Sequence, residues 1–166
     1  DRDEVLYSYA AAYAFGAYLT RNYGGTEFIK AVMTNNATNI PSLNQALQAR
    51  GASFAQGLSA YGQAFIFSGV HAPGRRSFNH TVTQGAYTFT GFDLWAIPNP
   101  AQGVGPLPKD YTGPLILDGA APRHPMPGYS VHLQSIQAWQ QVSTDTIRIR
   151  IEKPANPAVE LYLMVR

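Results

Sequence analysis

The stretch of sequence that most strongly indicates the fold is residues 4–23, EVLYSYAAAYAFGAYLTRNY. Apolar side chains recur there every three or four residues, the period that places them on one face of an α-helix. Further apolar residues widen this stripe until it nearly surrounds the helix, so we expect the helix to be buried on most sides. The stripe consists of Leu6, Ala10, Tyr13 and Ala17, widened by Tyr9, Phe15, Tyr18 and Leu19.

Three more helical patterns follow the first. Gly24-Gly25 is expected to end the first helix, because glycine readily adopts the left-handed conformation that stops one. New helical patterns then begin at Thr26, Pro41 and Ser53, and only short connections separate them. Residues 1–68 are therefore predicted to form an all-helical subdomain of about four helices.

From residue 69 onward the apolar period changes to two, which is typical of strands, and Pro and Gly become frequent. We predict a small antiparallel β-sandwich-like domain over residues 69–166, which makes the fold class α+β. Residues 98–127 are expected to be mostly loop. The expected strands are 82–89, 91–97, 115–117, 129–136, 145–151 and 159–165, of which the last two would pair as a hairpin.

The composition excludes several classes of protein. Only 13% of the residues are charged and 45% are hydrophobic, which argues against a disordered chain and against a coiled coil. The net charge is +2, and no Lys/Arg cluster exceeds Arg75-Arg76, so a nucleic-acid-binding protein is not expected. The chain has no Cys, which excludes disulfides and thiolate zinc sites. No apolar run is long enough to predict a transmembrane segment.

No catalytic motif is complete in the sequence. The histidines at 71, 80, 124 and 132 lack the spacing of the His-Glu-x-x-His zinc motif, and no Gly-x-Ser-x-Gly nucleophile motif occurs. Two interpretations of the histidines stay open: a metal site assembled from separate strands, or ordinary loop and strand-surface residues. We therefore expect neither a metal site nor a cofactor site that this chain completes by itself.

One stretch carries a more specific signal. Residues 7–25, YSYAAAYAFGAYLTRNYGG, resemble the segment downstream of the zinc site in hyicolysin-type metallopeptidases. The pattern Tyr-x-x-Gly, followed by an aromatic-Leu pair and Tyr-Gly, is similar to the C-terminal helical subdomain of gluzincins, zinc peptidases with two His ligands and a Glu. The resemblance covers residues 5–68 and extends only loosely to the later strands. It continues in Phe28-Ile29-Lys30, Leu43-Asn44-Gln45-Ala46-Leu47, Gly51 and Phe54.

The resemblance implies a role for one tyrosine. In those enzymes a Tyr on this helix reaches the active site and donates a hydrogen bond to the oxyanion of the tetrahedral intermediate. The residue that matches by its position in Tyr-x-x-Gly is Tyr13, and Tyr9, one turn earlier, is the second choice. The alternative interpretation is that both tyrosines pack in the core.

The chain departs from the family in the zinc site, because it contains no His-Glu-x-x-His segment. The resemblance implies that this segment, with its zinc, lies upstream of Asp1, and that the chain is the C-terminal portion of a longer bacterial precursor. It would then be a fragment of a peptide hydrolase, not catalytic by itself. Its partners would be the upstream catalytic segment and a peptide or protein substrate, in an extracellular or cell-envelope location.

Two further functions stay open. A non-catalytic extracellular module that binds carbohydrate or protein would use exposed aromatic side chains, with Trp95, Tyr111 and Trp139 as the candidates. A purely structural interaction domain would instead show an apolar patch on the first helix with no cleft beside it.

Overall fold

The computed structural model describes residues 2–69, 76–79, 81–96, 139–149, 155 and 163–164. The chain divides into two compact units, Asp1–Pro114 and Leu115–Arg166. Residues 82–89 therefore fall in the same unit as the helices, although we predicted that they belong with the later strands. The predicted division at residue 68 concerns a β domain that lies mostly outside the described residues, and it stays a prediction.

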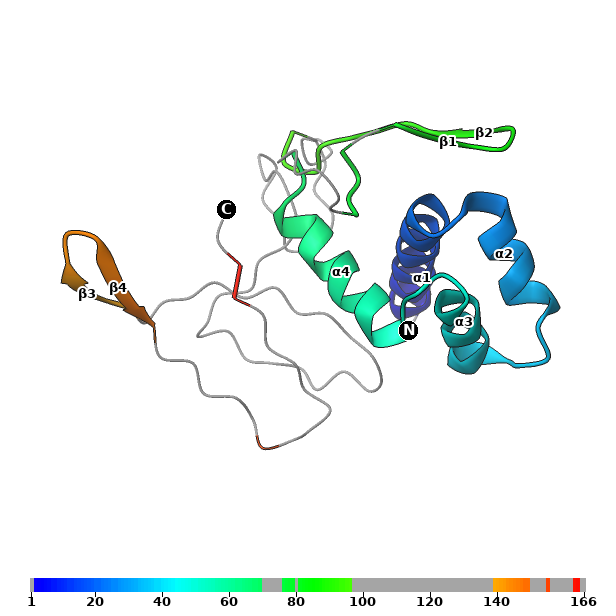
Figure 1. Cartoon of the computed structure of the whole chain (residues 1–166), viewed down its shortest axis with the longest axis horizontal. Coiled ribbons are helices and arrows are strands. Elements are labelled where there is room, and N and C mark those ends of the chain that lie inside the picture. The colour runs from blue at the N-terminus through cyan, green and yellow to red at the C-terminus, as the bar shows by residue number, and fades with distance from the viewer. Residues whose placement is uncertain are drawn as a thin grey trace. The chain divides into compact units, whose positions relative to one another are not determined.

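The first unit begins with four helices, which confirms the helical half of the predicted α+β fold (Figure 1). They are α1 (Arg2–Asn22), α2 (Gly25–Thr34), α3 (Asn39–Gln48) and α4 (Phe54–Ile66). Gly24 adopts a left-handed conformation with φ 114° and separates α1 from α2, as its position in the sequence predicted. Ser53 caps α4 in a reciprocal arrangement: its hydroxyl accepts from the backbone N–H of Gln56, whose side chain accepts from the N–H of Ser53.

Strands β1 (Val82–Gln84) and β2 (Tyr87–Phe89) form an antiparallel hairpin, in which Val82 pairs with Phe89. A single strand over residues 82–89 was the wrong prediction, because the chain reverses at Gly85, where φ is 61°. The strand predicted over residues 91–97 is also wrong for its described part. There the Asp93 carboxylate accepts from the N–H of Trp95 and holds the chain in a turn.

In the second unit, β3 (Trp139–Ser143) and β4 (Thr146–Ile149) form another antiparallel hairpin, with an irregularity between Gln141 and Ser143. Strand β4 confirms the central part of the strand predicted over residues 145–151, and β3 was not predicted. The strands predicted over 115–117 and 129–136 lie outside the described residues, as does most of 159–165. The described strands form two separate two-stranded sheets, and a sandwich-like arrangement stays a prediction.

The core of the first unit lies where the C-terminal end of α1 meets the other three helices. Tyr18, Leu19 and Leu47 are completely buried there. Aromatic rings continue the packing outward: Tyr18 lies 5.4 Å from Phe78 and 5.3 Å from Tyr61, measured between ring centroids. These rings connect α1 and α4 with the segment that leads to the β1–β2 hairpin. Such close-packed aromatic pairs contribute beyond the area that they bury.

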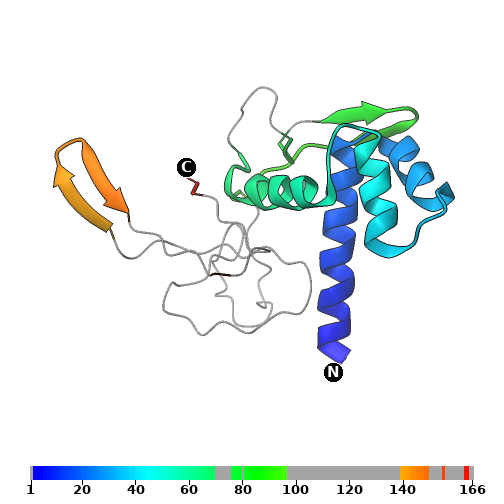
Figure 2. The same ribbon diagram turned by 60° about the horizontal axis from the view of Figure 1, so that its bottom comes forward.

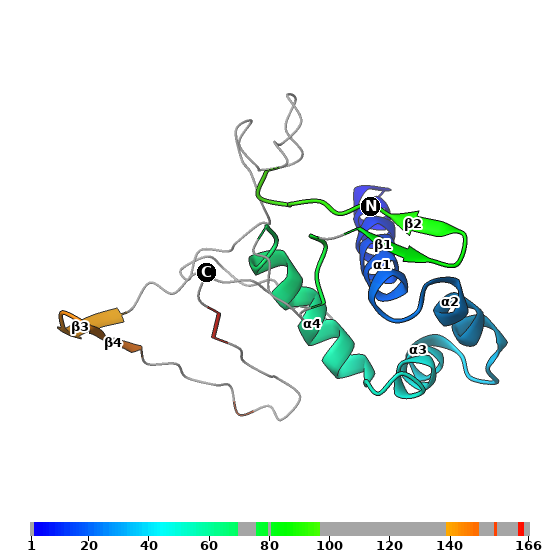
Figure 3. The same ribbon diagram turned by 45° about the horizontal axis from the view of Figure 1, so that its top comes forward.

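A buried arginine attaches the hairpin to α1. The guanidinium of Arg21 donates to the carbonyl oxygens of Phe78, Phe89 and Thr90, over 3.1–3.3 Å. In return, the side-chain amide of Gln84 donates to the carbonyl oxygen of Arg21, at 3.1 Å. The hairpin thus lies across the C-terminal end of α1 (Figure 3). Burial lowers the pKa of Arg21 from its ordinary value.

Replacing Arg21→Met should lower the free energy of unfolding of the first unit by about 2–4 kcal/mol, because the carbonyl oxygens of Phe78, Phe89 and Thr90 lose a charged donor. Urea unfolding followed by circular dichroism at 222 nm measures the change. The matched control is Lys30→Met, an exposed position in α2 where the same replacement should change the stability by less than about 0.5 kcal/mol. Equal effects of the two replacements would show that Arg21 does not hold the unit together.

Candidate functional site

The two predicted site residues lie on the first half of α1, where the helix extends past the other three (Figure 2). Tyr13 is 78% exposed and Tyr9 is 70% exposed. They are four residues apart, so their side chains lie on the same face of the helix. The interpretation of both as packed core residues is wrong, since the core of this unit begins at Tyr18.

The exposed face is apolar as well as aromatic. Val5 and Leu6 are 50% and 57% exposed, and residues 8–13 are exposed without interruption. The expectation that α1 is buried on most sides is therefore wrong for its first half and correct for its last turns. The reason is geometric: a 21-residue helix spans about 30 Å, and the ten to thirteen residues of each other helix cover only part of that length.

The tyrosines of this unit differ in burial. Burial raises the pKa of Tyr61 to about 12 and raises that of Tyr18 well above its ordinary value, with a smaller contribution from neighbouring Tyr23. The hydroxyl of Tyr18 is buried without a hydrogen-bond partner, so it cannot present a donor to a substrate. Tyr9 and Tyr13 are exposed on α1, so their hydroxyls can reach a bound molecule.

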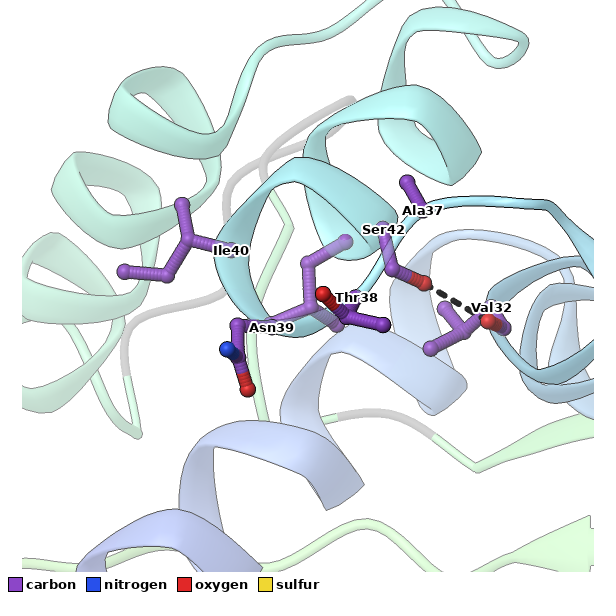
Figure 4. Close-up of a pocket in the computed structure, with 7 residues that line it drawn as sticks. Val32, Ala37, Thr38, Asn39, Ile40 and Ser42 are labelled. Carbon is purple, nitrogen blue, oxygen red and sulfur yellow. Dashed lines mark hydrogen bonds between the residues drawn. The ribbon is translucent and has the colours of Figure 1, made fainter.

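A depression of about 610 Å³ opens elsewhere on the first unit, between the end of α2 and the start of α3 (Figure 4). The hydroxyl of Ser42 lies at its edge but donates to the carbonyl oxygen of Val32 at 2.6 Å, so it is already engaged. No titratable side chain lines the depression, and α1 does not contribute to it. The lining residues are Val32, Ala37, Thr38, Asn39, Ile40, Ser42 and Leu43.

Within the described ranges, no three His, Asp or Glu side chains come close enough together to hold a metal ion. All four histidines lie outside these ranges, so both interpretations of them stay open. The described residues therefore offer no ligand set for the zinc that the resemblance implies.

The aromatic residues proposed for a binding module are only partly described. Trp95 is half-buried, and its indole N–H donates to the carbonyl oxygen of Phe65 at 3.1 Å, which joins it to the end of α4. Tyr111 and the side chain of Trp139 lie outside the described residues. Trp95 is thus part of the internal packing of the first unit.

Arg21 is a buried charged residue whose hydrogen bonds the sequence pattern did not predict. It lies three residues after Tyr18 and two before Tyr23, both buried. A charged side chain inside such an apolar stripe is the signal that could have drawn attention to it, because a buried charge needs several hydrogen-bond partners.

Comparisons with known proteins supply no assignment. No family model, no curated protein and no solved structure matches the chain. In the part of the chain that the structure describes, no helix has both the length and the apolar character needed to cross a membrane.

The raised pKa of Tyr61 predicts a loss of stability in alkali. Unfolded tyrosines release their protons near pH 10, whereas folded Tyr61 keeps its proton up to about pH 12. The stabilisation is therefore complete below pH 10 and is lost as the pH rises from 10 to 12. Tyr61→Phe should make this loss shallower, as measured by urea unfolding at each pH. Tyr87→Phe, at an exposed position of β2, should leave the slope of stability against pH unchanged. The same slope in both variants would show that Tyr61 does not cause the loss of stability in alkali.

Proposed function

We propose that the chain forms the C-terminal portion of a secreted bacterial zinc metallopeptidase of the hyicolysin type. In this proposal, the helical half, residues 1–68, forms one wall of the substrate cleft, and the β domain, residues 69–166, is an accessory part. The upstream segment supplies the zinc ligands. The observation that carries the proposal is the outward position of Tyr13: the residue that the resemblance assigns to the active site is 78% exposed on an apolar helix face.

The location of Tyr13 suits a hydrogen-bond donor. Its Cα lies five residues from that of Tyr18, which corresponds to about 7.5 Å along the helix axis. While the helix is formed, its buried end therefore sets the direction of the axis that carries the phenol. A neutral phenol can donate to an oxygen on which negative charge develops, and such a donor stabilises the transition state more than the ground state.

The proposal assigns the remaining chemistry to the upstream segment. There, zinc would polarise the peptide carbonyl and activate water, with the motif glutamate as general base. The contribution of this chain would be to position the oxyanion donor and to form an apolar surface that excludes water beside it. A peptide or protein is the expected substrate, and an extracellular or cell-envelope location is the expected setting.

An interaction domain is the second candidate, and one observation favours it. The apolar side chains at positions 5, 6, 9 and 13 are exposed together, and the depression described above is not lined by α1. A helix face of this kind also suits the docking of another protein without catalysis. The two candidates differ in what precedes Asp1, since only the peptidase requires a His-Glu-x-x-His segment there.

The test is the turnover of the longer natural protein after Tyr13→Phe. We expect kcat on a peptide substrate to fall by about 10²–10³, the usual effect of removing one oxyanion donor, with KM and the zinc content unchanged. Tyr87→Phe, an equally conservative change at an exposed tyrosine outside α1, is the control and should retain full activity.

The same measurement on Tyr9→Phe separates the two tyrosines. A fall of less than tenfold for Tyr13→Phe together with a large fall for Tyr9→Phe would move the role to Tyr9. Small effects at both positions would remove α1 from the catalytic mechanism. A coding sequence without His-Glu-x-x-His upstream of Asp1 would overturn the peptidase proposal and leave the interaction domain.

A further inference from the structure

Helix α1 is supported very differently along its length. Residues 8–13 are exposed, and so are Val5 and Leu6, whereas residues 18–21 are all buried. The last turns are further held by the hydrogen bonds of Arg21 and by the side-chain amide of Asn22, which donates to the carbonyl oxygen of Ser77 at 3.4 Å. Packing against α4 begins at Phe15, whose ring centroid lies 5.9 Å from that of Phe54 and 5.1 Å from that of Tyr61. The exposed residues before Phe15 depend mainly on their own backbone hydrogen bonds. Helices with so little tertiary packing are marginally stable in water.

Gly16 lies where the two halves meet. Glycine inside a helix costs about 1 kcal/mol relative to alanine, and a Cβ added at Gly16 would meet no atom within 4 Å. The space around this residue therefore gives no packing reason for glycine. Gly57 in α4 is different, because a Cβ there would contact the side chains of Leu19 and Leu47 at 3.4 Å.

Thr20 connects the packed turns of α1 with Gly16. Its side chain is buried, and its hydroxyl donates to the carbonyl oxygen of Gly16 at 2.8 Å. The carbonyl oxygen of Gly16 therefore accepts a side-chain hydrogen bond from the buried part of the helix. A threonine bonded back by four residues often bends a helix slightly at that position.

From these observations we propose that α1 consists of two parts that open separately, with the boundary between Tyr13 and Gly16. Residues 5–13 unfold and refold locally in the isolated chain, while residues 18–22 open only when the whole first unit unfolds. Where the peptidase function proposed above holds, the consequence is regulatory. Tyr9 and Tyr13 then lie on the part that becomes ordered when the catalytic segment docks against it.

Hydrogen exchange of the 166-residue chain tests the local opening. We expect the amides of residues 8–13 to exchange at least a hundredfold faster, relative to their intrinsic rates, than those of residues 18–22. Ala12→Gly, inside the exposed part, should accelerate the exchange of residues 8–13 about fivefold, since glycine lowers helix propensity. Ala55→Gly, at an exposed position of α4, is the control: it should accelerate residues 18–22 and leave residues 8–13 unchanged.

Equal protection of residues 8–13 and 18–22, or equal acceleration of both segments by Ala55→Gly, would overturn the proposal of two parts. The longer natural protein supplies the separate test of the regulatory consequence, in which residues 8–13 should gain protection to the level of residues 18–22. If the isolated chain shows local opening and the longer protein shows no such gain, the two-part helix stands and the docking that the peptidase function requires fails.

Discussion

The guanidinium of Arg21 is the interaction on which the assembly of the first unit depends. It is buried, and it bonds to carbonyl oxygens of two segments more than 50 residues away along the chain. A buried charge that loses its partners is costly, so the helix end, the segment around Phe78 and the strand β2 must come together for any of them to be stable there. This constraint fixes the last turns of α1 and places no such constraint on its first half.

The apolar period was sufficient to predict the four helices because it records which faces must avoid water. It could not show how much of α1 is covered. Tyr9, Tyr13 and Tyr18 look alike in the pattern, yet Tyr18 is completely buried and the other two are exposed. The difference comes from the lengths and crossing positions of α2, α3 and α4, which are properties of the assembled unit. Tyr9 and Tyr13 do lie on one face of α1, but the exposure of that face was not predicted.

Strands were harder to predict because alternation is a weak signal next to local hydrogen bonds. Residues 91–96 alternate in character, but the carboxylate of Asp93 bonds to the N–H of Trp95 and the hydroxyl of Ser68 accepts from the N–H of Leu94 at 2.8 Å. Each bond satisfies a backbone group that a strand would have to pair elsewhere. In the same way, Gly85 reverses a run that reads as one strand. Residues Thr146–Ile149 also alternate in character, and there the alternation predicted a strand correctly.

The same contrast between buried and exposed tyrosines limits which residues can perform chemistry. A phenol that stabilises developing charge must be held in place and must also be reachable, and these requirements oppose each other in a small helical unit. Tyr18 is held but not reachable. Tyr13 is reachable, and its position is fixed only as well as the helix that carries it. In the proposed peptidase, the exposed half of α1 would gain its precise geometry from the segment that covers it, and the role of Tyr13 would be shared between this chain and that segment.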